Sequence, residues 1–176
     1  MTGRLAKLFD SGMGANMAIR KEVLVAVGGF DEILGAGGKF PSFEDGDFAY
    51  RALKAGAAIL HLPNARVVHH GFRTWEAGRV IARETFTAIG AGYMKHVRCW
   101  DGIGLLLLTQ QIEKGAFEIF RNIVGLRRPI GLNRFISLFV GCYRSFGCQV
   151  DRRLAIYAQP SNSLVSALHP RPKEST

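Results

Sequence analysis

Apolar and polar residues follow two different patterns along the chain. From about residue 12 to residue 71, short apolar runs separated by glycine-rich turns predict an α/β segment. Two stretches of it, 21–27 and 43–55, have helical spacing, and Gly56 follows the second in the usual position after a helix end. Strands are predicted for the apolar runs at residues 15–19, 58–62 and 65–69.

The pattern becomes helical after residue 74. Residues 74–98 predict one amphipathic helix, on which Lys95 lies away from the apolar side. Residues 103–157 predict two further helices, separated by a breaker at residues 127–129. The end of the chain is rich in proline, serine and charge, which predicts a disordered tail. We therefore expect an α/β part, a helical extension and a tail, at residues 1–74, 75–158 and 159–176.

Composition predicts one ordinary domain in a reducing compartment. A chain of 176 residues with 48% hydrophobic residues can bury a core of usual size. Its three cysteines, Cys99, Cys142 and Cys148, are an odd number without a CxxC pair, which favours a reduced, cytoplasmic setting. Residues 1–12 lack the apolar run of a signal peptide, and no apolar run reaches the ~20 residues of a spanning helix.

The chain is strongly basic. Its 23 Lys and Arg against 14 Asp and Glu give a formal charge of +9, which attracts phosphates, nucleotides, anionic lipids or nucleic acid. No RNA- or DNA-reading motif accompanies the charge, so nucleic acid is not an expected partner. Arginines between residues 127 and 153 accompany Phe135, Leu138 and Phe139, which suits peripheral contact with the inner face of a membrane. The alternative is that these arginines solvate the outer faces of packed helices.

Carboxylates cluster at the start of the predicted helix 43–55. Glu44, Asp45 and Asp47 follow a flexible glycine segment, and one acidic residue there is already explained by the helix dipole. Three such groups repel one another unless a metal ion, a base role or an acceptor hydroxyl makes use of them. Helix capping and a catalytic site therefore both remain open.

Histidines form a second candidate cluster. His69 and His70 end a predicted strand, and His61 lies eight residues before His69. Strand ends in α/β proteins often carry reactive groups, although a histidine pair without context is more often structural. With carboxylates in adjacent elements, such imidazoles can bind a divalent cation.

Five short sequence blocks occur in a fixed order through the first part of the chain. They lie at residues 14–20, 27–32, 43–51, 54–56 and 63–70. In order and composition they resemble the C-terminal half of the family 2 glycosyltransferases. The resemblance covers about residues 12–74 closely and the helical remainder only loosely. It implies part of a GT-A fold, the α/β fold of nucleotide-diphospho-sugar transferases, followed by the helical extension.

The resemblance also implies residue roles. Asp45 would be the catalytic general base, with Glu44 as its catalytic neighbour, and His69 would bind a divalent cation, Mn²⁺ or Mg²⁺. Substrate binding would fall to Gly29, Phe30, Asp31, Asp47, His70 and Arg73. The implied reaction is a single displacement with inversion, which passes a sugar from a nucleotide-sugar donor to a hydroxyl of a glycan or lipid-linked acceptor.

A complete member of that family begins with a donor-binding half that this sequence does not resemble. We therefore expect a separate donor-binding half as a partner, on which activity would depend. Two alternatives remain: a non-catalytic interaction or membrane-docking module derived from such a transferase, and a small metal-dependent hydrolase. The hydrolase would use Glu44, Asp45, His61 and His69, but no HExxH or comparable ligand spacing supports it.

Overall fold

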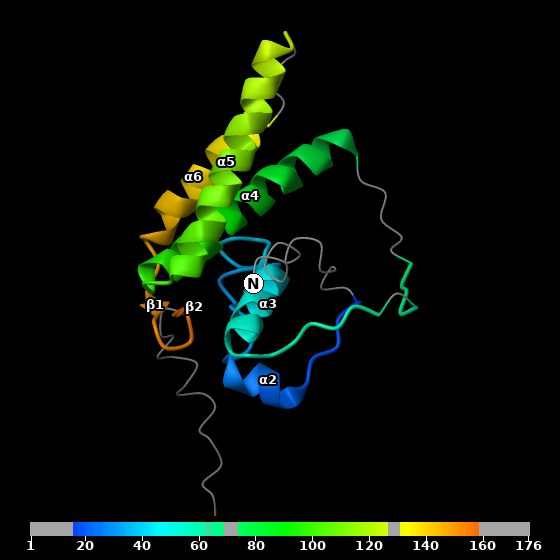
Figure 1. Cartoon of the computed structure of the whole chain (residues 1–176), viewed down its shortest axis with the longest axis vertical. Helices are drawn as coiled ribbons and strands as arrows, with labels where there is room; N and C mark the ends of the chain where they lie inside the picture. Colours follow the sequence, from blue (N-terminus) through cyan, green and yellow to red (C-terminus); the bar gives the residue numbers. More distant parts are fainter. Residues whose placement is uncertain (1–15, 63, 69–73, 127–130, 159–176) are drawn as a thin grey trace, which may run out of the picture.

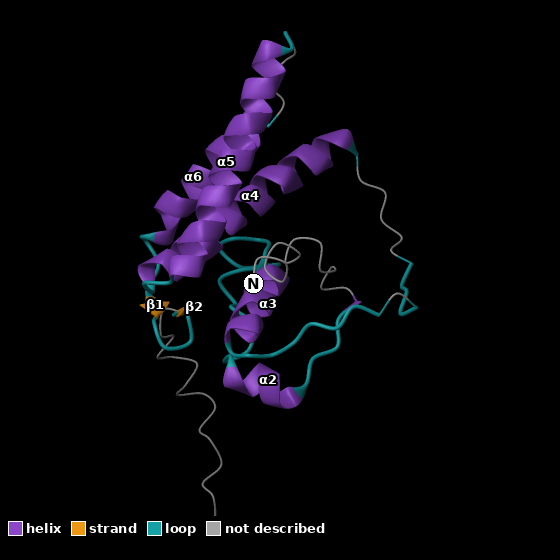
Figure 2. Ribbon diagram, viewed as in Figure 1, coloured by secondary structure: helices purple, strands orange, loops and turns teal. Residues whose placement is uncertain are grey.

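Helices dominate the structure, a computed structural model that describes residues 16–62, 64–68, 74–126 and 131–158. Within these residues two short strands form a hairpin beside the helices (Figure 2). The helices are α2 (Lys21–Ala26), α3 (Glu44–Lys54), α4 (Trp75–Arg98), α5 (Gly102–Val124) and α6 (Leu132–Ser145), and the strands are β1 (Val150–Asp151) and β2 (Ile156–Tyr157).

The predicted α/β architecture of a partial GT-A fold is wrong for this chain. Across the described residues the sheet consists of β1 and β2 alone, paired antiparallel with Val150 opposite Tyr157. Leu60 and Val68, from two predicted strands, are each 79% exposed. A strand-like run forms a strand only when a neighbour accepts and donates its backbone hydrogen bonds. Within the described residues, no strand forms at the predicted positions 15–19, 58–62 and 65–69.

Helical periodicity is the more reliable guide, and the predicted helices are confirmed as α2 to α6. The Thr74 hydroxyl begins α4 by accepting a hydrogen bond from the Ala77 N–H at 3.2 Å. Asp101 begins α5 similarly, accepting from the Ile103 N–H at 3.1 Å. Helix α6 ends at Ser145, so the prediction of helix up to residue 157 is wrong, and the hairpin occupies those positions.

The three long helices pack together above α3, and α4 lies directly against α6 (Figure 1). Two glycines allow this approach, because a Cβ on Gly141 would stand 1.9 Å from the Thr87 carbonyl oxygen. A Cβ on Gly90 would likewise stand 2.0 Å from the Leu138 carbonyl oxygen. The backbones of α4 and α6 are therefore in direct contact. No described helix is long and apolar enough to span a bilayer.

The core joins the first predicted part of the chain to the second. Tyr50 of α3 is buried in one cluster with Tyr93 of α4 and Leu138 of α6. A second cluster contains Phe40 and Tyr157, whose rings lie 5.9 Å apart. The predicted parts 1–74 and 75–158 thus share buried contacts, while the predicted tail lies outside the described residues.

Candidate functional site

The amino end of α3 presents two carboxylates immediately after a strained residue. Phe43, the N-cap of α3, has a φ of 74°, which a bulky side chain rarely adopts. Its ring meets the Tyr93 ring edge to face, with centroids 5.2 Å apart. A Cβ on Gly46 or Gly92 would come within 2.6 Å of the Phe43 ring, so these two glycines make room for it. The ring is thereby held in the core, and it fixes where α3 begins.

Glu44 and Asp45 follow in the first turn, and both are partly exposed. An Asp45 carboxylate oxygen accepts a hydrogen bond from the Gly46 N–H at 2.7 Å. The Glu44 side chain lies against Gly35, whose φ is 88° and whose added Cβ would stand 2.9 Å from the Glu44 carboxyl carbon. Both carboxylates also suit the positive end of the helix dipole, so the capping interpretation remains valid beside a catalytic one.

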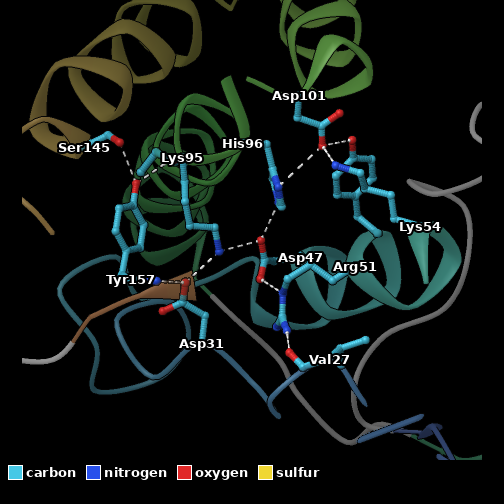
Figure 3. Close-up of polar contacts among 12 residues, drawn as sticks. Val27, Asp31, Asp47, Arg51, Lys54, Lys95, His96, Asp101, Ser145 and Tyr157 are labelled. Carbon is cyan, nitrogen blue, oxygen red and sulfur yellow. Dashed lines mark hydrogen bonds and ion pairs between the residues drawn. The ribbon is translucent and has the colours of Figure 1, made fainter. Parts of the chain in front are cut away.

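Asp47, two residues further, is fully buried and points toward Lys95 and His96 of α4 (Figure 3). One of its oxygens lies 2.7 Å from Lys95 Nζ and 2.9 Å from His96 Nε2, and the other accepts from Arg51 Nε at 2.8 Å. Burial by itself raises the pKa of Asp47, but Lys95 and the hydrogen bond from His96 outweigh burial and hold this pKa below its ordinary value. Asp47 is therefore ionised at the centre of a cation cluster.

Asp31 shares Lys95 with Asp47. Its Oδ2 lies 2.6 Å from Lys95 Nζ and accepts the Tyr157 N–H at 2.9 Å, and its Oδ1 accepts the Ile33 N–H at 3.1 Å. Lys95 lies away from the apolar side of its helix, as the sequence predicted, but its side chain is 0% exposed and therefore does not face solvent. One buried ammonium thus links the segment before α3, α3 itself and α4.

A second branch of the network continues from His96. Its Nδ1 lies 3.9 Å from Asp101 Oδ2 and has no hydrogen-bond partner among the described residues. That Asp101 oxygen accepts hydrogen bonds from the Tyr50 hydroxyl at 2.6 Å and from Lys54 Nζ at 2.7 Å. Burial lowers the pKa of His96 and outweighs the hydrogen bond to Asp47, so His96 is neutral and Nε2 carries the proton donated to Asp47.

Arg51 ties the network to the predicted substrate-binding turn. Its two terminal nitrogens donate to the Val27 carbonyl at 2.6 Å and the Gly29 carbonyl at 2.9 Å. Phe30, in the same turn, stacks on Phe48 of α3 with ring centroids 4.6 Å apart. The turn around Gly29, Phe30 and Asp31 is thus attached to α3 by buried contacts. A role for these residues in binding substrate stays a prediction.

The buried charges balance. Asp31 and Asp47 carry two negative charges, and Lys95 and Arg51 carry two positive charges within contact distance of them. The negative charge of Asp47, the third carboxylate of the acidic cluster at the start of α3, is therefore neutralised by Lys95 and Arg51 and needs no metal ion. Arg51 could have been inferred from its i,i+4 spacing to Asp47. Lys95 has no such signal, because it lies 64 residues from Asp31.

The described residues do not fit a divalent-cation site. They contain no group of three His, Cys, Asp or Glu side chains that could hold a metal ion. Asp47 has both oxygens engaged by cations, and His61 is exposed. His69, His70 and Arg73 lie outside the described residues. A depression of about 360 Å³ lined by Arg98, Gln149, Val150 and Arg152 includes none of the predicted site residues.

Comparison of the chain with protein-family models, with curated proteins and with solved structures finds no match.

Proposed function

We propose that the segment around Glu44 and Asp45 is the acceptor side of an inverting glycosyltransferase of the family 2 kind. The observation that carries this proposal is the geometry at the start of α3, where both carboxylates are partly exposed beside Phe43 with its left-handed backbone. Such strain costs about 1–3 kcal/mol and gathers at functional sites. The five ordered sequence blocks support the same assignment.

The reaction needs one base and one displacement. Asp45 accepts the proton of the acceptor hydroxyl while the oxygen of that hydroxyl forms a bond to the anomeric carbon of the donor sugar. The bond from that carbon to the nucleoside diphosphate breaks at the same time, and the diphosphate leaves with the electron pair. Attack opposite the leaving group inverts the anomeric centre. Glu44, beside Asp45, shapes the acceptor pocket in this proposal.

The buried network gives the other predicted residues a positioning role. Asp47 ties α3 to α4 through Lys95 and His96, and Arg51 attaches the Gly29 turn to α3. A base must lie within hydrogen-bond reach of the hydroxyl that it deprotonates. A helix that is held rigidly by such a network meets this requirement better than a free loop.

The donor in this proposal is a nucleotide sugar, and the acceptor is a hydroxyl of a glycan or of a lipid-linked glycan. A separate donor-binding half is the expected partner. A divalent cation, Mn²⁺ or Mg²⁺, remains part of the proposal through the resemblance alone. The described residues supply no site for it, so no step of the reaction is assigned to a cation here.

The test measures nucleoside diphosphate release from a panel of UDP-, GDP- and dTDP-sugars, with glycan and lipid-linked acceptors, and with Mn²⁺, Mg²⁺ or EDTA. Replacing the base in Asp45→Asn is expected to lower turnover at least about 100-fold, with nucleotide binding by calorimetry unchanged. Glu22→Gln, exposed on α2, is the matched control and should keep full activity. Equal turnover in Asp45→Asn and the unchanged chain would exclude Asp45 as the base.

A second candidate is a non-catalytic interaction or membrane-docking module, which is favoured by the apolar side chains exposed on α6. We also propose a cytoplasmic location with peripheral contact at the inner face of the membrane. This candidate would replace the transferase if the folded chain binds no nucleotide and releases no nucleoside diphosphate, either alone or with a donor-binding partner.

A further inference from the structure

One side of α6 is apolar and uncovered along its whole length. At about 100° per residue, its exposed apolar side chains fall within an arc of about 120°, and no charged residue lies in that arc. We call this set the outer stripe; its members are Leu132, Ile136, Phe139, Val140, Tyr143 and the C-cap Phe146. Tyr143 is 80% exposed and Ile136 is 50% exposed. Burial elsewhere would remove a large apolar area from water.

The packing of α6 prevents the outer stripe from turning inward. The opposite side of the helix, which includes Leu138 and Gly141, is buried against α4. Contact between Gly141 and the Thr87 carbonyl leaves no space for a side chain between the two backbones. Rotation of α6 would drive larger side chains into that contact. The outer stripe is thus held outward by a close-packed interface.

Helix α5 packs beside α6 and exposes further apolar side chains. The two helices touch where a Cβ on Gly115 would stand 2.6 Å from the Phe135 ring. Beyond this point the C-terminal end of α5 projects past the other helices (Figure 1). Phe117 and Phe120 on this end are each 64% exposed, and Leu126 just after the helix is 97% exposed.

The charge of these helices favours one kind of partner. Residues 102–145 contain six basic and two acidic residues, an excess of four positive charges on a chain whose formal charge is +9. A second copy of the chain would bring the same positive excess to the contact and would be repelled. An anionic lipid surface is both apolar in its interior and negatively charged at its headgroups, so it complements both properties.

We propose that the outer stripe of α6, with the exposed end of α5, inserts into the interfacial region of an anionic lipid bilayer. With 14 residues, α6 is about 21 Å long, shorter than the about 30 Å of a bilayer core. The helix therefore lies in the plane of the membrane surface rather than across it. Arg144 is exposed and lies beside the apolar arc, where its charge suits the phosphate headgroups. Arg134 lies on the opposite side of α6, with its guanidinium 5.9 Å from the centre of the Phe86 ring. This inference does not depend on transferase activity, because these helices lie outside the acidic segment.

The test is co-sedimentation of the full chain with vesicles of phosphatidylcholine alone and of phosphatidylcholine mixed with phosphatidylglycerol. Binding is expected on the mixed vesicles and should be at least about tenfold weaker without phosphatidylglycerol. The variant Phe139→Ser/Tyr143→Ser should lose at least about tenfold in binding to mixed vesicles. Val25→Ser/Leu60→Ser, which removes two side chains 69% and 79% exposed elsewhere, should bind unchanged. Circular dichroism and thermal unfolding verify that each variant is folded.

Three outcomes would overturn the proposal. The first is that the folded chain binds neither vesicle. The second is that Phe139→Ser/Tyr143→Ser binds as well as the unchanged chain, which would reduce the contact to charge attraction alone. A dimer in light scattering that the same variant abolishes would show instead that a second copy covers the outer stripe. Arg144→Gln tests the charge component and should weaken binding about fivefold to mixed vesicles only.

Discussion

Replacing Lys95 with methionine tests whether the buried ion network holds the fold together. Methionine keeps the length and apolar stem of lysine but removes the ammonium that lies 2.6 Å from Asp31 and 2.7 Å from Asp47. Both carboxylates are 0–1% exposed, so neither can regain water. Removing one partner of a buried pair typically costs about 3–5 kcal/mol, because the other charge remains buried.

The loss should fall mainly on Asp31. Asp47 keeps Arg51 and His96, whereas among the described residues Asp31 keeps only the backbone N–H donors of Ile33 and Tyr157. We therefore expect most of the destabilisation to disappear in the double variant Asp31→Asn/Lys95→Met, where the orphaned charge is removed as well. A cost of about 3–5 kcal/mol is a large part of the about 5–15 kcal/mol that stabilises an ordinary domain.

The assay is urea unfolding followed by circular dichroism. At a slope of about 2 kcal/mol per molar urea, the Lys95→Met midpoint should fall by about 2 M. Arg79→Met is the matched control, since its guanidinium lies 3.8 Å from Glu76 and both side chains are exposed, and it should cost no more than about 1 kcal/mol. Equal midpoints for the two variants would refute the central role of Lys95 in the network.

Two further variants probe packing and protonation. Gly141→Ala should destabilise the chain by about 1–3 kcal/mol or more, because the added Cβ would stand 1.9 Å from the Thr87 carbonyl oxygen. Gly78→Ala is the control, because the space around Gly78 is open. In the same urea assay it should be neutral or stabilise the chain by up to about 1 kcal/mol. Stability should also fall as pH decreases below about 6.5: burial lowers the pKa of His96 in the folded chain, so the unfolded chain takes up this proton first. Urea titrations between pH 7 and pH 5 should show this slope, and His96→Gln should remove it; an unchanged slope in that variant would assign the proton uptake to other groups.

Local sequence determined where most helices of this protein lie. Periodic apolar residues and the break near residues 127–129 act within a few positions of one another, so the existence of α4, α5 and α6 followed from them. The end of α6 at Ser145 did not, because residues 150–157 pair as a hairpin instead. The strands failed for the converse reason. A short apolar run such as 58–62 forms a strand only when another strand pairs with its backbone, and the tertiary fold decides whether such a neighbour is present.

The candidate site divides in the same way. The sequence located Glu44 and Asp45 at the start of a helix, because helix position and acidic character are local properties. The orientation of Asp47 was decided by Lys95 and His96, which arrive from α4 nearly fifty residues later in the chain. Only tertiary packing could bring those groups together, because charged side chains are stable in a water-free core only when their partners from other elements are buried with them. The sequence alone therefore determined where carboxylates occur, and the tertiary structure decided which of them meet solvent and which meet buried cations.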